Sequence, residues 1–374
     1  MQTQVISLDP SADQSAEIGR AAAALAEGAL VAFPTETVYG LAANAARESS
    51  VERLRQIKGR TSLQPFTVHI GQRSDFEQFV PEVGPLARRF MKKGWPGPLT
   101  LVLPVEHPEQ AEVHNRLSEA GRASIYQNHT VGLRFPDHAI AAMFLRQAAV
   151  PVVATSANSG GASAPTDAAE VKSALEGQVD LILDGGPCRY KRASTIVVLN
   201  GQGYELLRAG VLDARTIKRM ATLSILFVCT GNTCRSPMAE GICKQKIAER
   251  MKCKVVDLAG RGVEVRSAGT MAFDGGRASP EAVDVCRRLE IDISGHVART
   301  LSLELIHPAD YVYTMGRHHL EVIRSLSPAE VSKASPLDAD EDISDPLGGT
   351  VEDYERVARK ISTALDKRLS EVPL

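Results

Sequence analysis

Hydrophobic positions in the front half of the chain fall in short runs that proline, glycine or polar residues interrupt. Residues 15–29 (SAEIGRAAAALAEGA) carry apolar side chains at helical spacing and predict an amphipathic helix that ends near Gly28. VERLRQIKGR and AIAAMFLRQAA predict two more helices. Strands are predicted for LVAFP, FTVHI, PLTLVLP, TVGLRFP, VPVVATSAN, VDLILDGG, STIVVL and YELLRAG. Because predicted strands outnumber helices and several could pair as hairpins, we expect a mixed, twisted sheet.

The pattern changes after residues 211–223 (VLDARTIKRMATL), which are expected to connect two parts of the chain. The strands SILFV, VEVRSAG and ADYVYTM then alternate with the helices MAEGICKQKIAERM, SPEAVDVCRRL and HHLEVIRSL, and a last helix, VEDYERVARKISTALDKRLSEV, follows. Strands that alternate with helices predict a parallel, doubly wound α/β sheet. We therefore predict two α/β domains, residues 1–212 and 224–374, with a linker at 213–223.

The bulk composition fits this division and excludes several protein classes. At 374 residues the chain is long for one domain. No apolar run approaches the ~18–20 residues that span a membrane, and the net charge of −2 gives no global basic field for nucleic acid. The start, MQTQVISLDPSADQ, lacks a secretory signal. Six cysteines in a chain of this length do not suggest a disulfide framework, so we expect a cytoplasmic protein with reduced thiols and no membrane partner.

A possible nucleophile stands at the end of the first strand of the back half. Cys229 is followed by Arg235 in a Cys-x5-Arg pattern, and Ser236-Pro237 suits the start of a helix. A loop between a strand and a helix N-terminus turns backbone N–H groups toward an anion. We expect this field to lower the thiol pKa from ~8.5 toward ~3.5–7.5, while the Arg235 fork binds phosphoryl oxygens. The alternative is a buried structural cysteine that ends a strand.

Phosphoryl transfer from such a site also needs an acid for the leaving group. Asp345, in the glycine-rich stretch SDPLGG, is the candidate, although a capped surface turn is the alternative for this residue by itself.

At this point the back half resembles a known family. ILFVCTGNTCRSPMAE is similar to the signature of the low-molecular-weight protein tyrosine phosphatases, and VRSAGT, GHVART, ADYVYTM and DPLGG follow in the family's order. The resemblance implies a doubly wound four-stranded parallel sheet without a cofactor. It also implies that Cys229 is the nucleophile, Arg235 binds the phosphoryl group and Asp345 is the general acid. It further implies that Cys234 can form a protective disulfide with Cys229. The implied phosphate loop also includes Thr230, Gly231, Asn232, Thr233 and Ser236.

Two positions bear on the phosphatase substrate, which would be a phosphorylated protein. Thr233 stands where tyrosine-specific members usually carry isoleucine, and Leu347-Gly348-Gly349 follows the Asp-Pro where those members carry aromatic residues. Both features resemble the bacterial protein-arginine-phosphatase branch. A threonine hydroxyl suits a polar phosphoramidate, and the loss of aromatic walls weakens phosphotyrosine stacking. Phosphoarginine is therefore expected, with phosphotyrosine and arsenate-reductase-like chemistry left open.

Polar residues in the front half gather where the predicted strands end, which is where α/β sheets tend to bind ligands. FPTETVYGLAANA brings two threonines and a carboxylate, and KGR, at 58–60, brings positive charge. No Walker-type phosphate motif is present. His107 and His114 lack metal-ligand spacing, and we predict no metal site in the protein itself.

The set of front-half motifs resembles the family that makes threonylcarbamoyl-adenylate (YrdC/Sua5-like) for the t6A modification of tRNA. The resemblance implies a twisted mixed sheet with a concave cleft, the substrates ATP with Mg²⁺, L-threonine and bicarbonate, and a link to the tRNA threonylcarbamoyl-transfer machinery. Thr61 follows KGR where proline is usual in the family. The implied threonine contacts are Thr37, His69, Arg134, Ser156 and Ser194, and the implied ATP contacts are Lys58, Arg60, Gln64, Thr130, Asn158, Thr166 and Arg208.

Two hypotheses of another class remain open. The front half could be an RNA-binding module that delivers a phosphatase to ribonucleoproteins, although it lacks an aromatic-basic stacking motif. The back half could read phosphorylated residues without turning them over, although Cys229, Arg235 and Asp345 are all present. Direct binding of tRNA also stays open.

Overall fold

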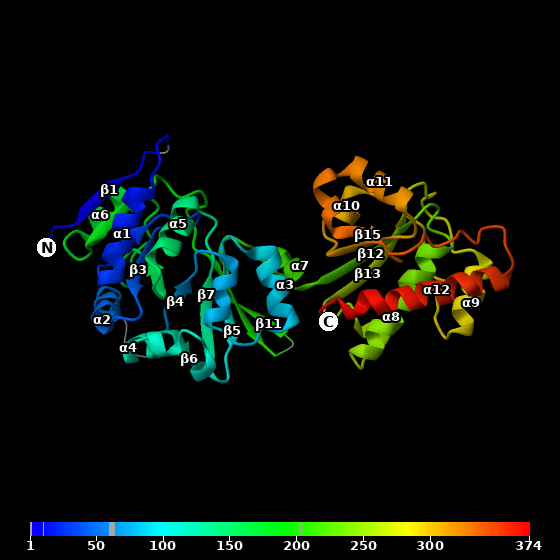
Figure 1. Cartoon of the computed structure of the whole chain (residues 1–374), viewed down its shortest axis with the longest axis horizontal. Helices are drawn as coiled ribbons and strands as arrows, with labels where there is room; N and C mark the ends of the chain where they lie inside the picture. Colours follow the sequence, from blue (N-terminus) through cyan, green and yellow to red (C-terminus); the bar gives the residue numbers. More distant parts are fainter. Residues whose placement is uncertain (1, 10, 60–63, 202) are drawn as a thin grey trace. The chain divides into compact units, whose positions relative to one another are not determined.

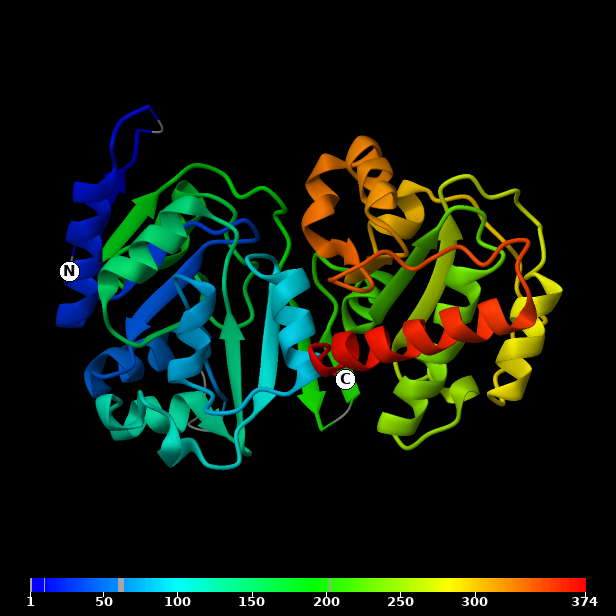
Figure 2. The ribbon, with the colours of Figure 1, turned by 45° about the vertical axis from the view of Figure 1, so that its right-hand side comes forward.

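The computed structural model describes residues 2–9, 11–59, 64–201 and 203–374, and Figures 1 and 2 show its ribbon. The chain divides into two compact units, Met1–Met220 and Ala221–Leu374. Within the described ranges, each unit is built on one sheet. No helix in the described part combines the length and the apolarity that crossing a bilayer requires.

Unit 1 is built on a mixed sheet, as the sequence predicts. Its strand order is β1-β9-β2-β3-β8-β4-β7-β5-β10-β11, with β6 paired to β7. The pairs β1–β9, β2–β9, β4–β7 and β5–β10 are parallel, and β2–β3, β3–β8, β4–β8, β5–β7, β6–β7 and β10–β11 are antiparallel. The strands are β1 (Gln4–Ser7), β2 (Val31–Phe33), β3 (Gly40–Asn44), β4 (Thr67–His69), β5 (Leu99–Pro104), β6 (Tyr126–Gln127), β7 (Thr130–Arg134), β8 (Val152–Ser156), β9 (Leu181–Asp184), β10 (Thr195–Asn200) and β11 (Gly203–Arg208).

Helices pack on the sheet of unit 1 through small, aliphatic and aromatic side chains. Helix α1 ends where the pattern predicts, because Gly28 adopts φ +108° and closes it. Ile18 of α1 and Phe144 of α5 share one core cluster with Phe33 of β2. The helices are α1 (Ser15–Glu27), α2 (Glu48–Ile57), α3 (Pro85–Gly94), α4 (Glu119–Ile125), α5 (Ala139–Ala148), α6 (Ala168–Leu175), α7 (Ala214–Ala221) and the 3-10 turns η1 (Arg73–Gln78), η2 (Pro108–Gln110) and η3 (His114–Arg116).

Unit 2 has the parallel doubly wound sheet that the sequence predicts. Its order is β13-β12-β14-β15, and all three strand pairs are parallel. The strands are β12 (Leu223–Cys229), β13 (Val263–Gly269), β14 (Tyr311–Thr314) and β15 (Ala334–Pro336). The helices are α8 (Arg235–Arg250), α9 (Pro280–Arg288), α10 (Leu303–Ile306), α11 (Arg317–Leu326), α12 (Val351–Ser370) and the 3-10 turns η4 (Val255–Asp257) and η5 (Pro328–Lys333).

The central strand β12 is apolar on both faces because helices cover both. Ile225 and Phe227 join one core cluster, which includes side chains of α8 and α12. Leu226 and Val228 join a second cluster with Ile306 of α10 and Ile323 of α11. Successive side chains of a strand point to opposite faces, so the sheet lies between α8, α9 and α12 on one side and α10 and α11 on the other (Figures 1 and 2).

Candidate active sites

The loop that carries Cys229 lies at the point where the strand order of unit 2 reverses. Strand β12 is flanked by β13 and β14, and its last residue, Cys229, pairs with Gly269. Ligands of open α/β sheets bind at such switch points. A Cβ on Gly269 would come within 2.5 Å of the Thr230 carbonyl oxygen and 2.9 Å of the Asn232 nitrogen, so glycine lets the loop fold tightly over β13.

The Cys229 sulfur is buried among hydrogen-bond partners at this turn. Its Sγ lies 2.9 Å from Ser236 Oγ and accepts a hydrogen bond of 3.2 Å from the Asn232 N–H. Burial raises the pKa of the Cys229 thiol, and the contacts with Ser236, the charge of Arg235 and the Asn232 N–H act in the opposite direction. The sequence predicts a lowered pKa, and this prediction is wrong for the resting loop, because desolvation outweighs the stabilising contacts.

Asn232 holds the loop in its curved form. It adopts φ +55°, a conformation that asparagine tolerates better than most residues. Its Nδ2 donates to Ser236 Oγ and to Ser267 Oγ, both at 2.9 Å, and its Oδ1 accepts from the Arg299 N–H at 2.9 Å. These three bonds offset the backbone strain and fix the position of Ser236 beside the sulfur.

Arg235 and Asp345 meet at the mouth of the loop, although 110 residues separate them. The Arg235 guanidinium forms an ion pair with the Asp345 carboxylate. It also donates to the Ile343 carbonyl and to Thr230 Oγ1, both at 3.2 Å. The Arg235 side chain is 6% exposed and that of Asp345 is 43% exposed, so the carboxylate lies on the solvent side. An anion that entered the loop could therefore replace this carboxylate as the partner of Arg235.

The remaining loop residues also have defined surroundings. Cys234 Sγ lies 3.3 Å from the Tyr354 hydroxyl, and Cys229 and Cys234 are both free thiols. Thr233 Oγ1 lies 3.6 Å from Cys234 Sγ, and Gly231 is half-buried. His319, whose Nε2 lies 3.1 Å from Thr230 Oγ1, is a further residue of the site that the sequence does not predict. No spacing pattern marks this histidine, because it reaches the loop from a different helix.

In unit 1, Lys58 connects two of the predicted residues. Its Nζ donates to the Ser156 carbonyl at 3.0 Å, the Asn158 carbonyl at 2.6 Å and Asn158 Oδ1 at 2.9 Å. Lys58 is buried. The structure thus brings Lys58, Ser156 and Asn158 together at the end of β8.

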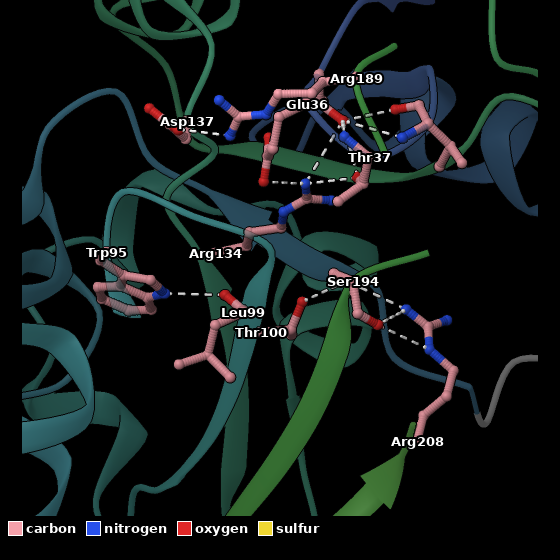
Figure 3. Close-up of polar contacts among 12 residues, drawn as sticks. Glu36, Thr37, Trp95, Leu99, Thr100, Arg134, Asp137, Arg189, Ser194 and Arg208 are labelled. Carbon is pink, nitrogen blue, oxygen red and sulfur yellow. Dashed lines mark hydrogen bonds and ion pairs between the residues drawn. The ribbon is translucent and has the colours of Figure 1, made fainter. Parts of the chain in front are cut away.

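Arg134 is the centre of a second polar cluster (Figure 3). Its Nη2 donates to Glu36 Oε1 at 2.9 Å, Thr37 Oγ1 at 2.7 Å and Thr35 Oγ1 at 3.4 Å. The side chains of Arg134 and Glu36 are 6% and 1% exposed. His69 pairs with Arg134 across β4 and β7. Burial and the charge of Arg134 lower the pKa of His69 to about 3, so its imidazole is neutral at pH 7.

Ser194 lies in a third cluster beside the second, because Thr100 pairs with Arg134 across β5 and β7. Its Oγ is 3.0 Å from Thr100 Oγ1. Arg208 donates from Nε and Nη2 to the Ser194 carbonyl at 3.1 and 2.7 Å, and from Nη2 to Ser194 Oγ at 3.1 Å (Figure 3). Strand register thus places Ser194 on the same part of the sheet as Arg134 and His69.

Four predicted residues lie apart from these clusters or cannot be placed. Thr130 begins β7, at the opposite end from Arg134, and donates to the Gln127 carbonyl at 2.8 Å. Thr166 Oγ1 donates to Glu170 at 3.1 Å, and Gln64 is exposed. Arg60 lies outside the described residues.

Glu36, Thr35 and Thr100 complete the second and third clusters, and no individual role is predicted for them from the sequence. The first two stand in FPTETVYG, where a carboxylate between two threonines at the end of an apolar strand is a usable signal. Thr100 lies inside an apolar strand and carries no such signal. No group of three or more His, Cys, Asp or Glu side chains in the described ranges could hold a metal ion.

Comparison with known proteins gives separate matches for the two units. The family Sua5/YciO/YrdC, described as "Telomere recombination", matches residues 23–210, and the family "Low molecular weight phosphotyrosine protein phosphatase" matches residues 224–373. A threonylcarbamoyl-AMP synthase of Bacillus subtilis is 38% identical over 202 residues, which are 54% of this chain and 56% of that protein. The chain thus spans little more than half the length of this relative.

Two further relatives bear on the two units. A protein-arginine-phosphatase of Bacillus subtilis is 37% identical over 148 residues, which are 38% of this chain and 92% of that protein. The crystal structure of P. abyssi Sua5 complexed with L-threonine matches with a TM-score of 0.52 and 25% identity, and covers 96% of this chain and 98% of that one. The chain therefore belongs to two families: through residues 23–210 to the Sua5/YciO/YrdC family, and through residues 224–373 to the low-molecular-weight phosphotyrosine protein phosphatase family.

Proposed function

We propose that residues 1–212 make threonylcarbamoyl-adenylate from L-threonine, bicarbonate and ATP for tRNA modification, and that residues 224–374 are a cysteine-dependent protein phosphatase. The observation that best supports the first activity is the convergence of Arg134 and His69, on the neighbouring strands β7 and β4, with Thr37 after β2 and Ser194 just before β10. The P. abyssi relative with a complexed L-threonine supports the same assignment. Both reactions use cytoplasmic substrates, so a cytoplasmic location is part of the proposal.

Each cluster of unit 1 has a role in this reaction. The Arg134 cluster binds the threonine carboxylate, and neutral His69 and Ser194 hydrogen-bond its polar groups. Lys58 and Asn158, with Arg60, Gln64, Thr130, Thr166 and Arg208, bind ATP, whose phosphates carry Mg²⁺. The threonine amine and bicarbonate give a carbamate and water. The carbamate oxygen then attacks the α-phosphorus, and pyrophosphate leaves. Holding the reactants in register and neutralising charge supply most of the rate.

Pyrophosphate release from ATP is expected to require both L-threonine and bicarbonate. The requirement for both follows because the carbamate that attacks the α-phosphorus contains both. The measurement is pyrophosphate release by the full chain with each substrate omitted in turn. Pyrophosphate release that ignores either substrate would contradict the reaction, and tight RNA binding without any release would favour an RNA-binding module.

The observation that best supports the phosphatase activity of unit 2 is that Cys229, Arg235 and Asp345 lie around one loop at the N-terminus of α8. We propose that the Cys229 sulfur attacks phosphorus as a thiolate while Arg235 holds the phosphoryl oxygens. The bond from phosphorus to the leaving nitrogen or oxygen breaks, and Asp345 gives that atom a proton. Water then cleaves the phosphocysteine and returns the proton to Asp345. Burial raises the pKa of the resting thiol even with its Ser236 and Asn232 contacts, so the proposed attack uses the ionised fraction of Cys229, which the N-terminus of α8 and Ser236 increase.

Thr233→Ile is expected to shift substrate preference from phosphoarginine toward phosphotyrosine by about tenfold. The half-buried Thr233 side chain lies at the loop, where loss of its hydroxyl removes a polar contact for a phosphoramidate. The measurement is kcat/KM on phosphoarginine and phosphotyrosine peptides side by side, and Thr233→Ser is the matched control. A preference that Thr233→Ile leaves unchanged would remove this residue from substrate selection.

A further inference from the structure

Behind the phosphate-binding arginine of unit 2 lies a chain of polar contacts that the proposed mechanism does not use. Arg235 Nη2 donates to Thr230 Oγ1 at 3.2 Å, and Thr230 Oγ1 lies 3.1 Å from His319 Nε2. His319 stands in the first turn of α11 and is 0% exposed, and its backbone N–H donates to the Gly316 carbonyl at 3.1 Å. A buried side chain on a rigid helix thus touches the loop residue that faces the guanidinium.

One of the two hydrogen-bond directions follows from the groups involved, and the other depends on which ring nitrogen of His319 carries the proton. A guanidinium has only donors, so Thr230 Oγ1 accepts from Arg235. The single hydrogen of the Thr230 hydroxyl then needs an acceptor, and within the described residues its contact of this kind is His319 Nε2. Nε2 accepts only in the neutral tautomer that carries its proton on Nδ1, and Nδ1 has no hydrogen-bond partner among the described residues. Burial, with the charges of His318 and Arg235, lowers the pKa of His319 to about 4, which keeps the ring neutral at pH 7.

We propose that His319 is a positioning residue for Arg235: by accepting the Thr230 hydrogen, it turns the Thr230 oxygen lone pairs toward the guanidinium that binds the phosphoryl group. The inference rests on the proposed phosphatase function of unit 2. Without His319, the hydroxyl is free to rotate and to present its hydrogen to a cation. Arg235 then keeps the Ile343 carbonyl and the exposed Asp345 carboxylate as partners. The planar guanidinium of Arg235 is then held less firmly in the orientation that an incoming phosphoryl group requires.

The test compares variants of the full chain in two measurements: the dissociation constant for inorganic phosphate by calorimetry, and kcat/KM on a phosphoarginine peptide. Thr230→Val and His319→Leu are each expected to weaken phosphate binding and lower kcat/KM by about tenfold. The double variant is expected to be no worse than either single one, because both remove the same contact. His319→Gln, whose side-chain oxygen can accept from Thr230, should stay within about threefold of wild type. Ser325→Ala, at an exposed position of the same helix, is the control.

The outcomes separate this inference from the phosphatase assignment. Losses that multiply in the double variant, to about a hundredfold, would show independent roles and overturn the inference. Unchanged phosphate affinity in Thr230→Val, which keeps the shape of the side chain, would also overturn it, even if His319→Leu folds poorly. If the wild-type chain bound phosphate but did not hydrolyse phosphopeptides, the proposed phosphatase function would be wrong. The dissociation constants of the variants for inorganic phosphate would still decide whether His319 positions Arg235.

Discussion

Cys229→Ser is expected to reduce phosphatase turnover by on the order of 10⁴-fold or more and to leave threonine-dependent pyrophosphate release unchanged. A serine hydroxyl at this position can still contact Ser236, which lies 2.9 Å from the sulfur. It is a far weaker nucleophile than a thiolate, because it stays protonated in all working conditions. The measurement is phosphate release from a phosphoarginine peptide, with pyrophosphate release from ATP followed in the same preparation.

Cys253→Ser supplies the matched control, because this half-buried cysteine lies outside the loop and should leave both rates unchanged. Rates of alkylation at a series of pH values would add the pKa of Cys229, since only the thiolate reacts. If Cys229→Ser hydrolysed the peptide as fast as wild type, the covalent mechanism would be wrong. If Cys229→Ser still bound inorganic phosphate, this result would show that the Arg235 guanidinium binds the anion without help from the sulfur.

Strands with strong local patterns could be predicted, and strands defined by their neighbours could not. Leu223–Cys229 is an almost continuous apolar run, because helices cover both of its faces. Gly40–Asn44 is a strand because it pairs with β2 on one side and with β8 on the other. Its mostly small side chains do not alternate between apolar and polar, so the sequence pattern does not predict this strand. Ala334–Pro336 has three residues, ends in proline and is ordered through pairing with β14.

The two candidate sites show the same division between local and distant information. The six-residue step from Cys229 to Arg235 is local, and the fold forms the loop that the spacing predicts. The contact of His319 with Thr230 depends on how α11 packs, which no short pattern reports. The direction of the Cys229 pKa shift depends on the balance between desolvation and hydrogen bonds, and burial is a property of the whole fold.

Arg134→Met is expected to destabilise unit 1 by about 3–5 kcal/mol, the usual consequence of removing one partner from a buried ion pair. Glu36 would then remain in the interior without its cation, and its Oε2 already has no hydrogen-bond partner among the described residues. The single tryptophan of the chain, Trp95, is buried in unit 1, and its Nε1 donates to the Leu99 carbonyl at 2.9 Å. Urea unfolding followed by its fluorescence therefore reports unit 1 separately from unit 2.

Arg189→Met is the matched control, because Arg189 pairs with Asp137 at 2.8 Å on the surface, with side chains 56% and 47% exposed (Figure 3). An exposed pair of this kind contributes about 0–1 kcal/mol. Equal effects of Arg134→Met and Arg189→Met would show that the interior tolerates the Glu36 charge. The double change Arg134→Met with Glu36→Leu removes both charges and should recover most of the stability. Because that protein would fold and still lack both charged groups, its failure to release pyrophosphate would assign the Arg134–Glu36 pair to the reaction and not to stability alone.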